Sequence, residues 1–163
     1  MEVIAILIGF VILLTVHFLI THLSNTASGK KIAAAFLFSG QEMFSILNRR
    51  CSVKRINKAR GRAIYYRKCN CYVGSDFLII QGINNVFFKS YVTTFAVALP
   101  GSAIHKSWEG SLFKLVNVEL GTGKKEVKIV YKTTYFNESV YSLIISNLTP
   151  VEFEHLSVVK QWV

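Results

Sequence analysis

A run of 18 residues without a charged side chain, Val3 to Ile20, constrains this sequence more than any other feature. Extended to Leu23 as an α-helix, the run would be roughly 30 Å long, at about 1.5 Å per residue, which matches the hydrocarbon core of a bilayer. A secretory signal peptide carries basic residues before its apolar segment, and only Met1 and Glu2 precede this one. The sequence therefore predicts a transmembrane anchor over residues 1–23.

Basic residues are unevenly distributed around this segment. No lysine or arginine precedes it, whereas Lys30, Lys31 and a dense group beyond residue 48 follow it. Positively charged flanks stay in the cytoplasm, so we expect a single-pass protein of the cell membrane with its N-terminus outside and its C-terminal domain cytoplasmic. The chain has 19 basic and 9 acidic residues, and its net charge of +10 favours anionic partners such as phospholipid headgroups.

Three cysteines, Cys51, Cys69 and Cys71, are too few for a disulfide framework and fit a reducing compartment. The spacing of Cys69 and Cys71 puts both on one face of a strand. No histidine or second cysteine pair has ligand spacing, so we interpret them as small buried hydrophobic residues and expect no metal and no cofactor.

Residues 24–54 are predicted to link the anchor to a domain. Ser24–Lys31 is polar, whereas Ile32–Leu47 is amphipathic on a helical wheel. Polar residues interrupt this second apolar stretch and basic residues flank it, so it is a poor second span. We expect a helix lying at the membrane interface, the alternatives being a second span or a part of the domain.

The stretch from Arg49 to Lys68 is basic and contains no acidic residue. Next to an anchor, such a segment attracts anionic lipid by about 1 kcal/mol per well-placed charge. The alternative is that these residues only set the topology. Tyrosines alternating in a strand are more typical of cross-strand pairs than of base stacking, so nucleic acid is not an expected partner. The candidate lipid- or partner-binding residues are Arg49, Arg50, Lys54, Arg55, Lys58, Arg60, Arg62, Arg67 and Lys68.

From Arg62 onward the apolar residues recur with a period of two, which indicates strands. In 124–135 this alternation places Lys128 and Lys132 on a solvated face. Gly121–Gly123 is a hairpin signal, whereas 82–85 and the segment around Trp108 are expected to be loops. The strands are expected over 63–73, 77–81, two within 86–99, 111–120, 124–135 and 140–145.

A helix is expected after the last strand. Thr149-Pro150-Val151-Glu152 forms a capping box with proline at the first helical position. The apolar residues that follow recur at intervals of three or four and predict a packing face made of Phe153, Leu156, Val159 and Val163.

About seven antiparallel strands closed by one C-terminal helix is an order of elements that resembles the pleckstrin-homology (PH) superfold, including its small bacterial and GRAM-type versions. The segment Cys71–Ile80 is similar to the strand–turn–strand that often opens such domains. The resemblance covers 55–163 and implies a PH-like, mainly-β barrel plugged by its last helix. It also implies lipid contacts from basic residues near the first strand and loop, where Arg60, Arg62, Arg67 and Lys68 fall. A lipocalin-like or other small barrel is the alternative.

Sequence motifs for catalysis are weak. Gly121–Lys125 lacks the spacing of a phosphate-binding loop, and no nucleophile–base pair can be assembled from the residues present. The sequence therefore favours a membrane-anchored, non-enzymatic binding or scaffolding module that contacts anionic lipid or a protein partner. The alternatives are a structural or assembly subunit of a larger membrane complex and, less favoured, an enzyme centred on His105 and Glu109.

Overall fold

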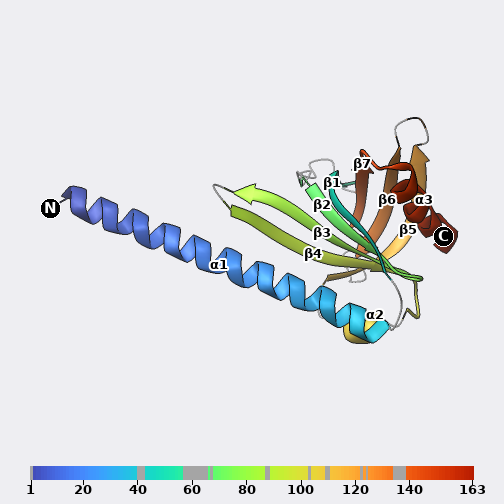
Figure 1. Cartoon of the computed structure of the whole chain (residues 1–163), viewed down its shortest axis with the longest axis horizontal. Coiled ribbons are helices and arrows are strands. Elements are labelled where there is room, and N and C mark those ends of the chain that lie inside the picture. Colours follow the sequence, from blue (N-terminus) through green and yellow to red (C-terminus); the bar gives the residue numbers. More distant parts are fainter. Residues whose placement is uncertain are drawn as a thin grey trace.

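A long apolar helix projects from a small, mainly-β domain, and the two chain termini lie at opposite ends of the molecule (Figure 1). The computed structural model describes residues 2–39, 43–56, 66, 68–86, 89–102, 104–108, 111–121, 123, 125–133 and 139–163. Helix α1 (Glu2–Ser39) contains one segment, Ile6–Ala34, that is long and apolar enough to cross a membrane.

Seven strands form the domain: β1 (Phe44–Arg55), β2 (Lys68–Val73), β3 (Phe77–Val86), β4 (Lys89–Ala98), β5 (Ser111–Gly121), β6 (Glu126–Thr133) and β7 (Val140–Ser146). They pair in sequence order, and β7 returns to β1, so the sheet closes into a barrel. Helix α2 (Ile104–Ser107) follows β4, whereas α3 (Pro150–Ser157) and the 3₁₀ helix η1 (Val158–Trp162) follow β7. The predicted long helix, seven-stranded domain and C-terminal helix are confirmed at this level.

One pairing is not antiparallel, contrary to the prediction. The chain between β4 and β5 includes α2 and runs back along the barrel, so β5 begins beside Phe95 and continues in the same direction as β4. A crossover of this kind makes neighbouring strands parallel. The other six pairings are antiparallel.

The first strand lies where we expected a connecting segment. The interfacial-helix prediction for Ile32–Leu47 was wrong, because 32–39 continue α1 and 44–47 belong to β1. A β-bulge interrupts the alternating pattern by which a strand is recognised in a sequence: Asn48 adopts φ 61° and the register with β2 shifts between Ile46 and Arg49. The inward residues Ile46, Cys51 and Val53 therefore do not alternate regularly.

The strands around β3 also differ from prediction. Residues 82–85 were expected to form a loop, but they continue β3, and 86–99 contributes one complete strand, β4, rather than two. In the sequence, Gly82 was interpreted as the end of a strand, because glycine is uncommon inside strands. In the barrel it makes room for Tyr66, because a Cβ at Gly82 would lie 2.5 Å from the tyrosine ring.

Two ends of the barrel can be distinguished. The helix-capped end is the one where β2 and β4 finish and where α3 packs (Figure 1). At this end Leu148, Leu156 and Val159 enter the core, whereas Val163, expected on the same face, is 66% exposed. The open end is the one where β1 and β3 finish. Phe95, Phe113, Tyr131 and Tyr141 fill the interior toward it as a chain of ring contacts.

Helix α1 packs against the outside of the barrel. Ile32 joins Phe77, Ala96, Ile104 and Trp108 in a second apolar cluster, which lies between the barrel wall, α1 and α2. The polar residues Thr21 and Ser28, on the same stripe of the helix, are buried. The predicted polar linker over 24–31 is therefore wrong: these residues belong to α1, and tertiary contacts hold this helix to the domain.

Candidate anion-binding surface

Charge is distributed unequally between the two ends of the barrel. All five acidic residues described outside α1 lie toward the helix-capped end: Asp76, Glu119, Glu126, Glu152 and Glu154. Four basic residues lie nearer the open ends of their strands, namely Lys54, Arg55, Lys68 and Lys132, whereas Arg49, Arg50, Lys125, Lys128 and Lys160 lie toward the helix-capped end with the acidic residues. Within the described ranges, the open end is therefore a cationic surface.

The predicted basic residues separate into groups in the structure. The side chains of Arg50, Lys54 and Lys68 are exposed, and alternation along β1 and β2 points them outward from the barrel. Arg55 donates a hydrogen bond to the hydroxyl of Ser139, the residue before β7. Lys58, Arg60, Arg62 and Arg67 lie outside the described residues.

Arg49 has a structural role. Its Nε and Nη2 lie 3.0 and 2.8 Å from Glu152 Oε1, while Glu152 Oε2 accepts hydrogen bonds from the backbone and the hydroxyl of Thr149. Burial alone raises the pKa of Glu152, but the hydrogen bonds from Arg49 and Thr149 outweigh it and hold the pKa below its ordinary value. Since this ion pair fastens the predicted capping box to β1, we exclude Arg49 from the candidate surface.

A cavity of about 400 Å³ opens on the outer wall formed by β1, β7 and β6. The strand registers produce two neighbouring rows of outward residues across β1, β7 and β6. The first row is Ser52, Ile144 and Lys128, and the second is Lys54, Ser142 and Val130. Two lysines and two serines from three strands therefore line one depression. Sequence reasoning identified Lys54 but missed the others as site residues; the only available signal was the alternation that placed Lys128 on a solvated face.

Lys128 and Lys54 differ in their surroundings. Lys128 Nζ lies 3.0 Å from both carboxylate oxygens of Glu119 on β5. In the described part of the chain, no hydrogen bond or ion pair is found for the Lys54 ammonium or for the hydroxyls of Ser52 and Ser142. The cavity is thus lined by available donors and by one lysine that Glu119 holds in position.

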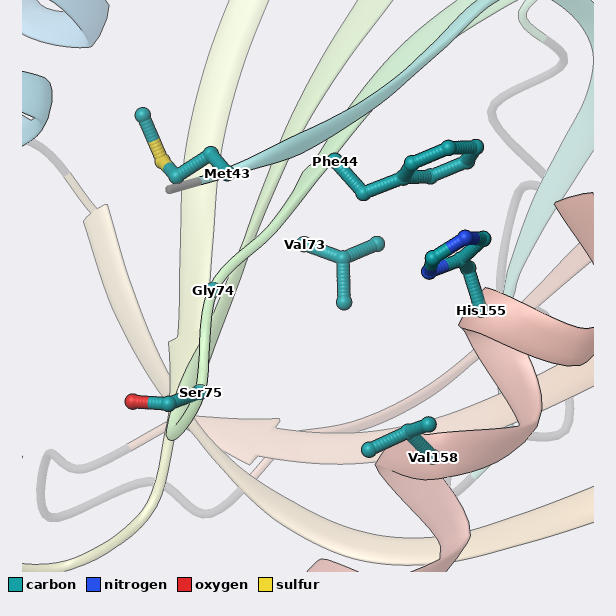
Figure 2. A pocket seen from close by; sticks show the side chains of 7 residues that line it. All are labelled: Met43, Phe44, Val73, Gly74, Ser75, His155 and Val158. Carbon is teal, nitrogen blue, oxygen red and sulfur yellow. The ribbon is translucent and has the colours of Figure 1, made fainter. Parts of the chain in front are cut away.

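A second cavity, of about 470 Å³, lies at the helix-capped end (Figure 2). Phe44 and His155 stack at its edge with ring centroids 3.6 Å apart, and Met43, Val73 and Val158 supply apolar walls. Among its lining residues only Ser75 and His155 carry polar side-chain atoms. This cavity lacks the lysines of the outer wall.

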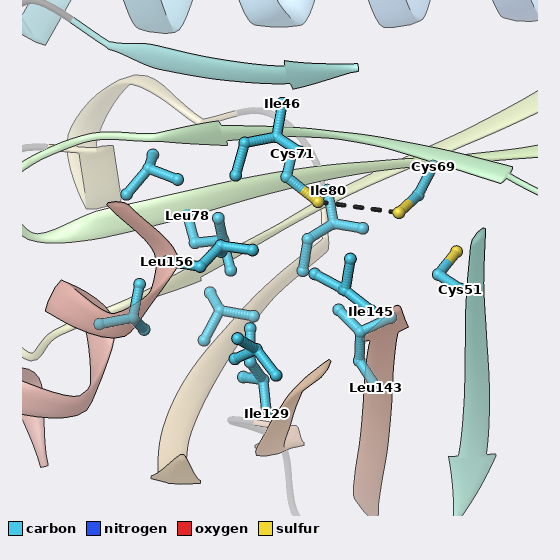
Figure 3. Packing of buried hydrophobic residues seen from close by; sticks show 14 of the residues in the cluster. Ile46, Cys51, Cys69, Cys71, Leu78, Ile80, Ile129, Leu143, Ile145 and Leu156 are labelled. Atoms are coloured by element: carbon cyan, nitrogen blue, oxygen red, sulfur yellow. Dashed lines mark hydrogen bonds between the residues drawn. The ribbon is translucent and has the colours of Figure 1, made fainter. Parts of the chain in front are cut away.

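The three cysteines come together inside the barrel (Figure 3). Cys69 Sγ lies 3.8 Å from Cys71 Sγ, and Cys51 approaches Cys69 from β1. A hydrogen bond to Cys69, together with burial, raises the pKa of Cys51. A buried, protonated thiol is a poor nucleophile, so these side chains act as core residues.

The other chemical candidates are dispersed. His105 Nε2 lies 2.9 Å from the carbonyl oxygen of Leu99, and its proposed partner Glu109 lies outside the described residues. Among the described residues, no group of three or more His, Cys, Asp or Glu side chains is arranged to hold a metal ion. A scan against protein-family models finds no match, and a search of curated proteins finds no similar sequence.

Proposed function

We propose that this chain is a membrane-anchored, non-enzymatic binding module whose PH-like barrel lies with its open, basic end against the anionic cytoplasmic face of the membrane. The observation that carries the proposal is that the described acidic residues of the barrel lie only toward the helix-capped end, so the described charged residues of the open end are all basic. Basic residues near an anionic bilayer gain free energy by proximity to the headgroups, by about 1 kcal/mol for each well-placed charge.

The surface of α1 supports a membrane anchor. Apolar side chains are exposed around the N-terminal part of the helix, with Ile6 at 71%, Leu13 at 68% and Leu19 at 57%. Contiguous apolar surface of this extent is unfavourable in water. A lipid environment would cover it, and the length of the segment suits a bilayer.

The packing of α1 supports a barrel held close to the bilayer. Thr21 and Ser28 are covered, whereas Leu19, Ile20 and Leu23 on the other faces of the helix remain exposed. The β3–β4 hairpin runs back along α1 toward its N-terminus (Figure 1). A membrane around the N-terminal part of α1 would therefore lie on the side of the open end.

The test uses the full chain in lipid nanodiscs made of phosphatidylcholine, with or without phosphatidylserine. An environment-sensitive fluorophore is attached to Thr93→Cys on β4 and, as the control, to Gln161→Cys on η1, both exposed positions. The native cysteines are buried and give little background. Quenching by nitroxide-labelled headgroups reports contact with the membrane surface.

With phosphatidylserine, the label at Thr93→Cys should be quenched more strongly than in phosphatidylcholine alone, and added salt should reverse the gain. The label at Gln161→Cys should not respond. Equal quenching at Thr93→Cys in both lipid mixtures, at low and high salt, would contradict the proposal. In intact cells, Gln161→Cys should resist a membrane-impermeant maleimide until the membrane is opened.

A structural subunit of a larger membrane complex is the second candidate. The observation that favours it is the same exposed apolar surface of α1, which other transmembrane helices would cover as well as lipid. Purification of the full chain in a mild detergent separates the two proposals. A stoichiometric membrane partner favours the subunit, and a monodisperse single chain favours the lipid-binding module.

A further inference from the structure

We propose that the outer cavity on β1, β7 and β6 is a discrete site for a phosphoryl group attached to a small apolar or glycerol-like moiety. The inference deepens the proposed function by naming a ligand class. It rests on that function only through Lys54, which belongs both to the basic open end and to this cavity. It concerns a defined pocket on the side of the barrel rather than the general charge of the open end.

The strand spacing brings the polar groups within reach of one anion. Neighbouring strands lie about 4.8 Å apart and residues rise about 3.4 Å along a strand, so Lys54 and Lys128, which are two strands and two residues apart, stand roughly 12 Å apart at their backbones, with β7 between them. The Lys54 side chain is long enough to bend toward β7, whereas the Lys128 ammonium lies beside Glu119 on β5. Ser142, directly beside Lys54 on β7, is only 6% exposed and lies at the floor of this space.

The donor set favours an anion with several oxygens. The Lys54 ammonium and the hydroxyls of Ser52 and Ser142 supply donors from two strands, and no carboxylate lines the cavity. Lysine ammoniums and hydroxyls are common ligands of phosphate oxygens. A metal cation would find no negatively charged ligand among these side chains.

Glu119 positions the second lysine. It holds Lys128 through both carboxylate oxygens from the neighbouring strand β5, on the side away from β7. A lysine ammonium has three donors, so one remains for a ligand. The contribution of Lys128 to binding should therefore be smaller than that of Lys54, because Glu119 already neutralises part of its charge.

The apolar lining specifies the rest of the ligand. Ile56 and Ile144 border the cavity next to the polar groups. A free phosphate ion would leave these side chains in water, whereas a phosphate ester would bury carbon atoms against them. A volume of about 400 Å³ suits a headgroup-sized molecule.

Calorimetric titration of the full chain in a neutral detergent tests the site, with inorganic phosphate, glycerol 3-phosphate and dihexanoyl phosphatidic acid as probes. Glycerol 3-phosphate should bind more tightly than inorganic phosphate. Lys54→Ala should weaken its binding about tenfold or more, Ser142→Ala several-fold, and Lys128→Ala less than Lys54→Ala. Tighter binding of the phosphatidic acid than of glycerol 3-phosphate identifies a lipid headgroup as the source, and equal binding identifies a soluble ester.

Matched controls separate this site from the open end. Lys68→Ala and Lys160→Ala remove exposed cations away from the cavity and should leave binding of glycerol 3-phosphate unchanged. Lys68→Ala should still reduce the contact with phosphatidylserine nanodiscs. The inference is overturned if the wild type binds none of the probes, or if Lys54→Ala and Ser142→Ala bind them as the wild type does, whatever happens at the membrane surface.

Discussion

At the helix-capped end, basic side chains meet carboxylates: Arg49 binds Glu152 and Lys128 binds Glu119. Toward the open end, no ion pair is found for Lys54 or Lys68 in the described part of the chain. The contrast separates two uses of positive charge. Arg49 fastens a helix to the barrel, so its loss should affect stability, whereas Lys54 and Lys68 should matter only when an anionic partner is present.

Truncation of Leu156, which fills the core at the helix-capped end, should have the largest effect on stability. Leu156 is fully buried among core residues from several strands. Leu156→Ala should lower the free energy of unfolding by about 2–5 kcal/mol, because the vacated volume is only partly refilled. Denaturant titration followed by circular dichroism measures the change. Val151→Ala, at a position 57% exposed on the same helix, is the control and should change it little.

Arg49→Ala should have the next largest effect, a loss of about 1.5–3 kcal/mol in the free energy of unfolding, because it leaves the partly buried Glu152 without its charged donor. Arg50→Ala, its exposed neighbour on β1, should change the same quantity by less than about 0.5 kcal/mol. Equal effects of the two substitutions would remove the distinction drawn between paired and unpaired cations.

Thr149→Ala should cost about 1 kcal/mol, since it removes the side-chain cap that accepts from the Glu152 backbone amide. Thr149→Ser keeps the hydroxyl and should recover most of the loss. Thermal unfolding of the three proteins under one buffer condition measures the series.

Acid should lower the free energy of unfolding through Glu152 at the helix-capped end. The pKa of Glu152 is lowered in the folded protein from an ordinary value of 4.5. Its contribution to stability is therefore present above about that pH and is lost as the pH falls through the lower, folded-state pKa. Unfolding free energies measured from pH 6 to pH 3 should fall more steeply for the wild type than for Glu152→Gln. Parallel curves would show that the carboxylate contributes nothing.

The smallest effect on stability is expected at the open end. Lys54→Ala and Lys68→Ala should each change the free energy of unfolding by less than about 0.5 kcal/mol. Together they should reduce the phosphatidylserine-dependent quenching at Thr93→Cys. A large loss of stability with unchanged quenching would mean that these lysines serve the fold, as Arg49 does.

Local patterns in the sequence were sufficient for several elements. The apolar run predicts the long N-terminal helix, the capping box at Thr149 fixes where α3 begins, and regular alternation gives β5, β6 and β7 to within a few residues. In each case the signal lies in a contiguous stretch, because helix caps and strand alternation depend on near neighbours.

The position of β1, the direction of β5 beside β4 and the contacts between distant residues became clear only from the tertiary structure. The bulge at Asn48 hides β1, the crossover makes β4 and β5 parallel, and the pairing of Arg49 with Glu152 joins residues far apart in the chain. The sequence predicted seven strands, but from a different set of segments. Lys54 and Lys128 line one cavity only because β7 lies between β1 and β6 and separates them by two strand spacings. Strand order and register depend on long-range packing, and no local pattern of residues contains that information.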